Sequence, residues 1–229
     1  MTFFPSFLKH LLILIVCGLC IMPLAAQDAA ADAYAEALRR IEEAAANESG
    51  RLDLRGLGLE TLPPEIGQLT NVEFLLLSDN HLTTLPPEIG QLSKLWALNL
   101  ASNRLTTLPD ELWQLTRLSI LELGSNQLTT LPAEIGQLTN IKFLTLSDNQ
   151  LTTLPLEIGQ LSIYQAGFER NPLTFPPPDV QAQGPGAVLA YLRDYNSTQI
   201  RQVIIVIAVI AGVIMLVLAF RRQHKKKHL

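Results

Sequence analysis

A pattern of 23 residues repeats along the middle of this 229-residue chain. The letters LTTLPxEIGQL begin at Leu82, Leu128 and Leu151, and the variant LTTLPDELWQL begins at Leu105. An earlier copy starts at Leu52, and a degenerate late copy ends in GFERNPLTFPPP, so the chain holds about six copies. A fixed period of this length is typical of solenoids, in which each copy forms one unit that stacks on its neighbours.

The apolar positions of each copy predict a core that neighbouring copies share. In the second copy, Val72, Leu75 and Leu77 are expected to point inward from a short strand, while Ile89 and Leu92 close the outer side. With Leu82 and Leu85 from the turn, the copy has seven such side chains, whose burial contributes about 10–20 kcal/mol. Ordering the 23 backbone residues costs at least about as much. One copy alone should therefore not fold. Stacked copies form an α/β solenoid, with a parallel sheet on the concave face and short helical or 3-10 turns on the convex face.

Asparagines recur at the interval of the repeat, the last one residue early: Asn80, Asn103, Asn126, Asn149 and Asn171. A buried amide at the corner between strand and turn can bond the free backbone groups of its own and the adjacent coil. The sequence therefore predicts a structural ladder of asparagines.

Both ends of a solenoid need a cap, because the terminal core would otherwise meet water. Residues 27–48 are predicted to form an N-terminal capping helix with an apolar stripe at helical spacing: Tyr34, Leu38, Ile41 and Ala45. The repeats are assigned to residues 49–178, and a C-terminal cap with linker to residues 179–199. Val188, Leu189 and Leu192 are expected on a short helix there, followed by a short linker at residues 196–202.

The two ends of the sequence predict how the chain is placed in the cell. Residues 1–26 have a basic start, a 12-residue apolar core and a small-residue cleavage site after Ala26, as in a secretory signal peptide, with an uncleaved anchor as the alternative. Val203–Phe220 is uncharged and would span about 27 Å as a helix. We therefore predict a transmembrane helix at residues 200–220 and a basic cytoplasmic tail at residues 221–229, with the repeats outside the cytoplasm.

Charge and cysteine content exclude several classes of function. All 21 acidic residues but only ten of the 17 basic ones lie between residues 28 and 194, which gives that segment a net charge of −11 (10 − 21). Nucleic acid is not expected as a partner, because its phosphates would be repelled. Both cysteines, Cys17 and Cys20, lie in the signal segment, so no cysteine-based metal site is predicted in the mature chain.

The repeats, with their LPxEIGQLTxL wording, follow the leucine-rich repeat signature LxxLxLxxNxLxxLP. Residues 33–195 resemble the bacterial and Roc-associated class of leucine-rich repeat proteins, and also the Ras-scaffold type. The ALRRIEEA segment and the NPLTFPPP…AVLAYLRDY ending carry the same resemblance. It implies a protein-interaction module and fixes no ligand. No GxxxxGK[ST] motif occurs, so the GTPase activity of Roc proteins is not carried over.

We find no catalytic constellation in the sequence, and we predict no enzyme activity, cofactor or metal. His81 is the one histidine between the two terminal segments, and we interpret it as an exposed turn residue. The repeated glutamates of the EIGQL segments are interpreted as a solvated convex row.

Variable residues next to the inward-facing leucines are the candidates for ligand binding on the concave face. The predicted set is Glu73, Phe74, Leu76, Trp96, Asn99, Ile120, Glu122, Lys142, Phe143 and Thr145. Exposed aromatic residues beside charges are typical of interface hot spots. The alternative is that Phe74, Ile120 and Phe143, which share one slot, only pack against neighbouring strands.

The resulting hypothesis is a single-pass membrane protein that binds a protein partner, or a surface polymer, along the concave face. The alternative is a structural envelope or adhesion scaffold that holds a neighbouring membrane protein laterally. A small-xxx-small pair, Ala208 and Gly212, leaves open a homodimer through the membrane helix.

Overall fold

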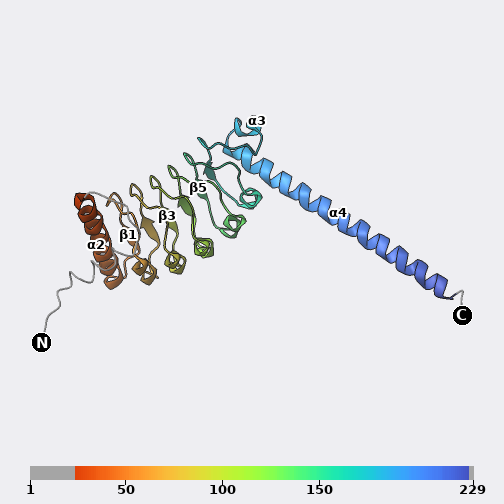
Figure 1. Cartoon of the computed structure of the whole chain (residues 1–229), viewed down its shortest axis with the longest axis horizontal. Coiled ribbons are helices and arrows are strands. Elements are labelled where there is room, and N and C mark those ends of the chain that lie inside the picture. The colour runs from red at the N-terminus through yellow and green to blue at the C-terminus, as the bar shows by residue number, and fades with distance from the viewer. Residues whose placement is uncertain (1–23, 227–229) are drawn as a thin grey trace.

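The computed structural model describes the backbone of residues 24–226 and the side chains of residues 29–211 and 214. A row of coils runs between two helices, α2 (Leu24–Ala46) and α4 (Pro185–Lys226), and α4 projects far beyond the coils (Figure 1). Residues 1–23 of the predicted signal peptide and the last three residues of the predicted tail lie outside the described residues.

Six short parallel strands form one sheet in sequence order. They are β1 (Arg51–Asp53), β2 (Phe74–Leu76), β3 (Ala97–Asn99), β4 (Ile120–Glu122), β5 (Phe143–Thr145) and β6 (Gln165–Gly167). The register advances by one repeat per strand, so that Leu75 pairs with Leu98 and Leu98 with Leu121. A short 3-10 helix follows each of the first five strands: η1 (Pro64–Gln68), η2 (Pro87–Gln91), η3 (Asp110–Gln114), η4 (Ala133–Gln137) and η5 (Leu156–Gln160). The predicted parallel sheet with short turns opposite it is confirmed.

The core lies between the sheet and the 3-10 helices, and the repeated leucines fill it. Val72, Leu75 and Leu77 are fully buried, and so are Ile89 and Leu92 from the turn of the same coil. The apolar side chains from the N-terminal helix to α4 form one continuous cluster. The coils therefore share their hydrophobic faces, as the energetics of a single copy require.

The asparagines lie in a buried line beside the core. Nδ2 of Asn103 donates to the carbonyl oxygens of Leu77 and Leu100 at 2.9 and 3.0 Å. Its Oδ1 accepts the backbone N–H of Leu82 at 3.0 Å. Equivalent bonds recur at each asparagine position, with partners in the same coil and in the preceding one. Each asparagine thus fastens its coil to the one before it.

The convex turns pack closely because most of them carry glycine at the same position. A Cβ atom placed on Gly90 would lie 2.7 Å from both Cβ and the carbonyl oxygen of Glu111 in the next turn. In η3 the corresponding residue is Trp113, which is 1% exposed. The backbones of η3 and η4 approach each other less closely than those of the other neighbouring turns, which makes room for the indole.

The N-terminal cap is present, and its buried stripe agrees with the predicted one at Ile41 alone. The buried residues of α2 are Ala33, Ala37, Ile41 and Ala44. Tyr34 and Leu38 are half-buried and Ala45 is exposed. The helix packs on β1 and η1 through its small side chains, because alanines allow the backbone to approach the first coil closely. The large residues lie at the edge of the contact.

The C-terminal cap is the first part of α4. Val188, Leu189 and Leu192 are buried there, and Nε of Arg193 donates to the carbonyl oxygen of Gly159 at 2.8 Å. The break expected at residues 196–202 is absent, since α4 continues through them. No glycine or proline interrupts this stretch, and the hydroxyl groups of Ser197 and Thr198 both donate to the carbonyl oxygen of Asp194, which keeps these polar residues in the helix.

The predicted transmembrane helix lies inside α4, but most of its side chains beyond Ala211 are outside the described residues. Over the part of the chain that the structure describes, no helix is both long enough and apolar enough to cross a membrane.

Candidate functional site

The outward surface of the parallel sheet, here called the strand face, holds the predicted binding residues. Successive residues of a strand point to opposite faces of the sheet. Leu75, Leu98, Leu121 and Leu144 point into the core, so their strand neighbours project outward. The row that begins each strand is therefore outward, and it consists of Arg51, Phe74, Ala97, Ile120, Phe143 and Gln165.

The aromatic residues of the strand face are neither buried nor fully free. Phe74 is 36% exposed, Trp96 is 42% exposed and Phe143 is 40% exposed. The rings of Phe74 and Trp96 lie 5.5 Å apart at an angle of 58°. The tilted geometry is one that aromatic pairs favour. These side chains pack partly against one another and still present a large apolar area to a partner.

The predicted stripe is interrupted at one position in the register. Ala97 stands between Phe74 and Ile120 and is buried. Trp96 precedes that alanine, and its ring lies beside Phe74. Ile120 and Phe143 are register neighbours on adjacent strands. Each of four consecutive coils therefore contributes one bulky apolar side chain to the strand face.

The second outward row is mixed, with Leu76 beside the polar residues Asn99, Glu122 and Thr145. Asn99 accepts the backbone N–H of Ala101 through its side-chain oxygen at 3.0 Å, which fixes the amide. Leu76 and Glu122 are half-buried on either side of it, and Thr145 is exposed. Lys142 lies with its Nζ atom 5.3 Å from the centre of the Tyr164 ring, within the range of a cation–π contact.

Some charges of the strand face are already paired and some are not. The Arg55 guanidinium bonds the Asp53 carboxylate and lowers the pKa of that carboxyl. Arg170 bonds Asp148 and lowers its pKa in the same way. For Glu73 and Glu122, no hydrogen bond or ion pair of the carboxylate is found with any described residue. Two carboxylates are therefore available to a partner on this face.

Sequence reasoning missed Tyr164, which at 79% exposed presents the most accessible large ring of the coils. It occupies the slot of Trp96 and Lys142, since its backbone bonds the carbonyl of Lys142 as Trp96 bonds that of Glu73. The last coil is one residue short, so alignment at the 23-residue interval places Gln165 in this slot. An alignment counted back from Asn171 would have found the tyrosine.

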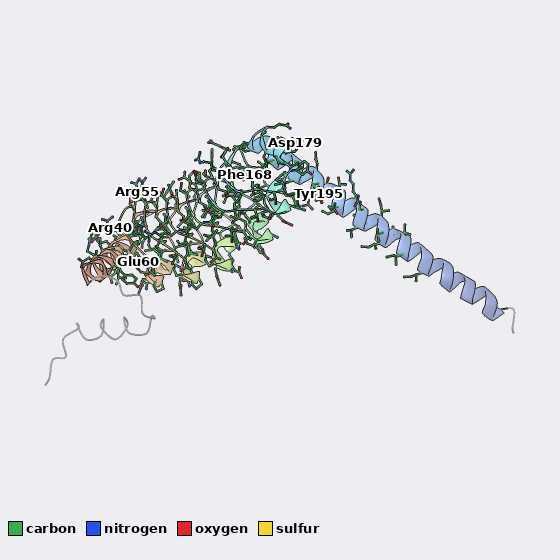
Figure 2. All side chains as sticks on the ribbon, turned by 45° about the horizontal axis from the view of Figure 1, so that its top comes forward. Arg40, Arg55, Glu60, Phe168, Asp179 and Tyr195 are labelled. Atoms are coloured by element: carbon green, nitrogen blue, oxygen red, sulfur yellow. The ribbon has the colours of Figure 1, made fainter. Side chains whose placement is uncertain are left out.

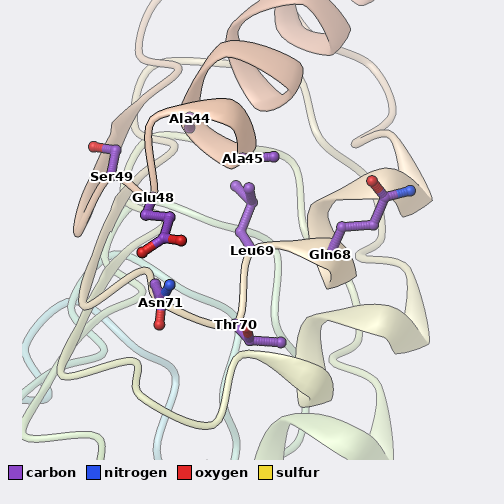
Figure 3. Close-up of a pocket in the computed structure, with 8 residues that line it drawn as sticks. All are labelled: Ala44, Ala45, Glu48, Ser49, Gln68, Leu69, Thr70 and Asn71. Atoms are coloured by element: carbon purple, nitrogen blue, oxygen red, sulfur yellow. The ribbon is translucent and has the colours of Figure 1, made fainter.

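Two hollows outside the strand face are small. One hollow lies where the end of α2 meets the first coil, beside Glu48, Leu69 and Asn71 (Figure 3), and its volume of about 30 Å³ fits a single water molecule. A second hollow, of about 140 Å³, lies near Phe168 and Gln181. Small-molecule sites are usually about 300–1,000 Å³. Among the described residues, no group of three or more His, Cys, Asp or Glu side chains could hold a metal ion.

Two family models match the chain, both described as leucine rich repeat. One covers residues 71–92 and the other residues 93–151. Residues 71–151 therefore carry leucine-rich repeats, as their period predicts. No curated protein matches the chain.

Two solved structures are similar to the coils over more than half of this chain. The leucine-rich repeat ectodomain of an Arabidopsis thaliana membrane receptor kinase, GASSHO1/SCHENGEN3, solved with Casparian strip integrity factor 2, is 33% identical over 56% of this chain and 16% of its own length, with a TM-score of 0.50. The Drosophila Toll–Spätzle complex is 31% identical over 58% of this chain and 18% of that one, with a TM-score of 0.51.

A bacterial structure shows a higher sequence identity. A leucine-rich repeat protein of Leptospira interrogans is 40% identical over 52% of this chain and 36% of its own length, with a TM-score of 0.42. The chain thus spans between 16% and 36% of these three relatives.

Proposed function

We propose that this chain is a non-enzymatic recognition module that binds a protein partner on its strand face. The observation that carries the proposal is the exposure of Phe74, Trp96 and Phe143 on a sheet whose other side is fully packed. Aromatic side chains that lose little freedom on binding are enriched in interface hot spots. A sheet with one strand per coil holds them in fixed positions, so little entropy is lost when a partner docks.

The similar structures support a protein or peptide as the partner. The plant ectodomain is described in complex with Casparian strip integrity factor 2, and the Drosophila structure is that of the Toll–Spätzle complex. This chain covers only 16% and 18% of the two matched chains, so the chemistry of its own strand face must supply the specificity.

We further propose that a membrane anchor displays the coils outside the cytoplasm. The support comes from the sequence, in which Val203–Phe220 has no charge and the basic tail RRQHKKKHL follows. The described part of this segment is exposed on all sides, with Val203, Ile205 and Ile207 more than half accessible. Burial of these side chains in hydrocarbon would remove that apolar surface from water.

The partner site can be tested with a photo-crosslinking amino acid at Phe143 in cells that express the full chain. We expect an adduct with a second protein, and we expect Phe74→Ala with Trp96→Ala to abolish that adduct. The double variant should keep one cooperative thermal unfolding transition, because both rings lie outside the continuous core. A crosslinker at Glu134, on the convex side, is the matched control. An unchanged adduct in the double variant would contradict the strand face as the site, and an equal adduct from Glu134 would favour a lateral scaffold.

Protease added to sealed cells tests the display. The coils should be degraded there, whereas the tail should be reached only after permeabilisation. Coils that are protected until permeabilisation would reverse the orientation, and a chain that leaves the membrane fraction at alkaline pH would contradict the anchor.

A further inference from the structure

The spacing of the apolar side chains on the strand face restricts the shape of a partner. Adjacent strands of a sheet lie about 4.8 Å apart, and each coil contributes one strand. Phe74, Trp96, Ile120 and Phe143 come from four consecutive coils. Their stripe therefore advances about 4.8 Å per side chain along the row of coils, and the 5.5 Å between the Phe74 and Trp96 rings agrees with this step.

This step matches an α-helix better than an extended peptide. An amphipathic helix presents apolar side chains on one face about once per turn, that is, every ~5.4 Å. An extended strand presents every second side chain to one face, which gives about 6.7 Å. Over the three intervals of the stripe, of ~14 Å, a helix is about 2 Å too long and a strand about 6 Å too long. The apolar side chains of a helix of about three turns can therefore contact all four side chains of the stripe. Those of an extended peptide cannot, because their spacing is too wide.

The charges beside the stripe restrict the chemistry of that helix. Glu73 flanks the stripe at its first coil and Glu122 flanks it at the third, in the outward row next to Ile120. Within the described residues neither carboxylate has an ion-pair partner, while Asp53 and Asp148 do. The cation on this face closest to the far end of the stripe, Lys142, already contacts Tyr164. Arg51, which pairs with Phe74 in the strand register, is a second cation beside the first coil. The charge beside the stripe is therefore mixed, and at Glu73 and Glu122 it complements basic residues.

We propose that the strand face binds an amphipathic α-helix of about three turns that belongs to a partner protein. Its apolar face lies on Phe74, Trp96, Ile120 and Phe143, and lysine or arginine residues on its flanks lie against Glu73 and Glu122. This is the helix-in-groove mode of peptide recognition. The inference rests on the proposed function, because it names the kind of segment that the proposed site would bind.

A random peptide library tests the inference without a known partner. Peptides of 18 residues are selected on the full chain in detergent, and those that lose binding to the Phe74→Ala, Trp96→Ala double variant are sequenced. We expect apolar residues at i, i+3 or i+4, i+7 and i+11 with Lys or Arg beside them. The selected peptides should become helical when bound, as measured by circular dichroism.

Variants of the carboxylates test the charge complementarity. Glu73→Gln and Glu122→Gln should each weaken the selected peptides by about two- to fivefold at low salt, and the loss should shrink as salt screens the pairs. The matched control is Glu111→Gln with Glu134→Gln on the convex turns, which should leave the affinity unchanged. Equal effects from both sets would overturn the charge assignment.

The outcomes separate this inference from the proposed function. Peptides that depend on the strand face but alternate apolar and polar residues, or are rich in proline, would overturn the helix and leave the site intact. Peptides that bind the double variant equally well would count against the strand face itself. A selection that yields no peptide dependent on the strand face would overturn the inference as well.

Discussion

At the scale of single residues, the buried asparagines show how polar groups hold an apolar solenoid together. The carbonyl oxygen of Leu77 accepts from both Asn80 and Asn103, each at 2.9 Å. One carbonyl therefore joins the amides of two successive coils, and the pattern continues along the molecule. Because these groups are shielded from water, removing one amide leaves backbone partners unsatisfied, at a cost of about 1–3 kcal/mol for each group.

Asn103→Ala should therefore lower the free energy of unfolding by about 2–3 kcal/mol, mainly because the Leu82 N–H loses its acceptor. The control is Asn140→Ala, whose exposed amide makes one bond, to the carbonyl oxygen of Thr116 at 2.7 Å. That change should stay within about 0.5 kcal/mol. Urea denaturation followed by circular dichroism measures both, and equal losses would contradict the role of the ladder.

Ion pairs on α2 make one carboxyl unusually acidic. Side-chain hydrogen bonds from Arg39 and then Arg40 lower the pKa of Glu36 from 4.5 to about 2. A carboxyl whose pKa is lowered by folding stabilises the fold above its ordinary pKa, and this contribution disappears as the pH falls through the lowered value. Between pH 4.5 and about 2 the native chain should thus lose the small contribution of this pair.

An NMR titration of the Glu36 carboxyl carbon should give a midpoint near 2 in the unaltered chain. Replacing both arginines by glutamine should return the midpoint to about 4.5, because the donors are gone. A midpoint near 4.5 in the unaltered chain would show that the exposed pairs do not hold in solution.

At the scale of elements, four of the five convex turns depend on one glycine each, and η3 carries Trp113 in its place. Gly90 lies where any side chain would press on the backbone of the next turn, whereas no heavy atom lies within 4 Å of a Cβ placed on Gly186. Gly90→Ala should cost about 1–3 kcal/mol by overpacking, and Gly186→Ala should be neutral or slightly stabilising. Thermal unfolding compares the two, and similar melting temperatures would refute the close packing of the turns.

Trp113 tests the packing between convex turns in the opposite way, because it is a large residue where the other turns have glycine. Its ring is buried, and its Nε1 atom has no partner among the described residues. Trp113→Ala should destabilise the chain by about 3–5 kcal/mol, because the widened gap between η3 and η4 would remain as a cavity. If the neighbouring turns close the gap, the loss in urea denaturation will fall well below this range.

At the scale of the whole molecule, the repeats were predictable in detail, whereas the two capping helices were predictable in their presence and only partly in their packing. Each core position recurs in five or six repeats, so the burial of Leu75 is predicted by the equivalent residues Leu98 and Leu121. The caps occur once, and their packing was decided by distance to the first coil, which favoured Ala37 and Ala44 over Leu38. Residues 196–202 do not belong to a repeat either, and their polar side chains suggested a linker. In the structure, local hydrogen bonds keep this segment helical.

The sequence predicted most of the residues that lie on the strand face, but it did not predict which of their side chains contact one another. The period places Phe74, Ile120 and Phe143 in one row, but the approach of Trp96 to Phe74 depends on the small Ala97 beside it. Tyr164 escaped because the last coil is a residue shorter. Whether these residues bind a ligand is a question for the crosslinking experiment.

Helix α4 caps the last coil and then projects away from it (Figures 1 and 2). The helix has no break between the buried Leu192 and the apolar segment. An α-helix turns 100° and rises 1.5 Å per residue. One alanine inserted after Ser197 would therefore rotate the strand face by about 100° relative to the proposed anchor, while seven would bring it back to within about 20°.

Binding to a partner that is fixed in the same membrane would depend on this rotation of the strand face. Binding to a freely diffusing partner would not. For the fixed partner, the crosslink to Phe143 should disappear after one inserted residue and return after seven, and losses that only grow with length would mean that the stalk bends. The orientation of the strand face would then be set by the number of residues in α4 between the last coil and the apolar segment.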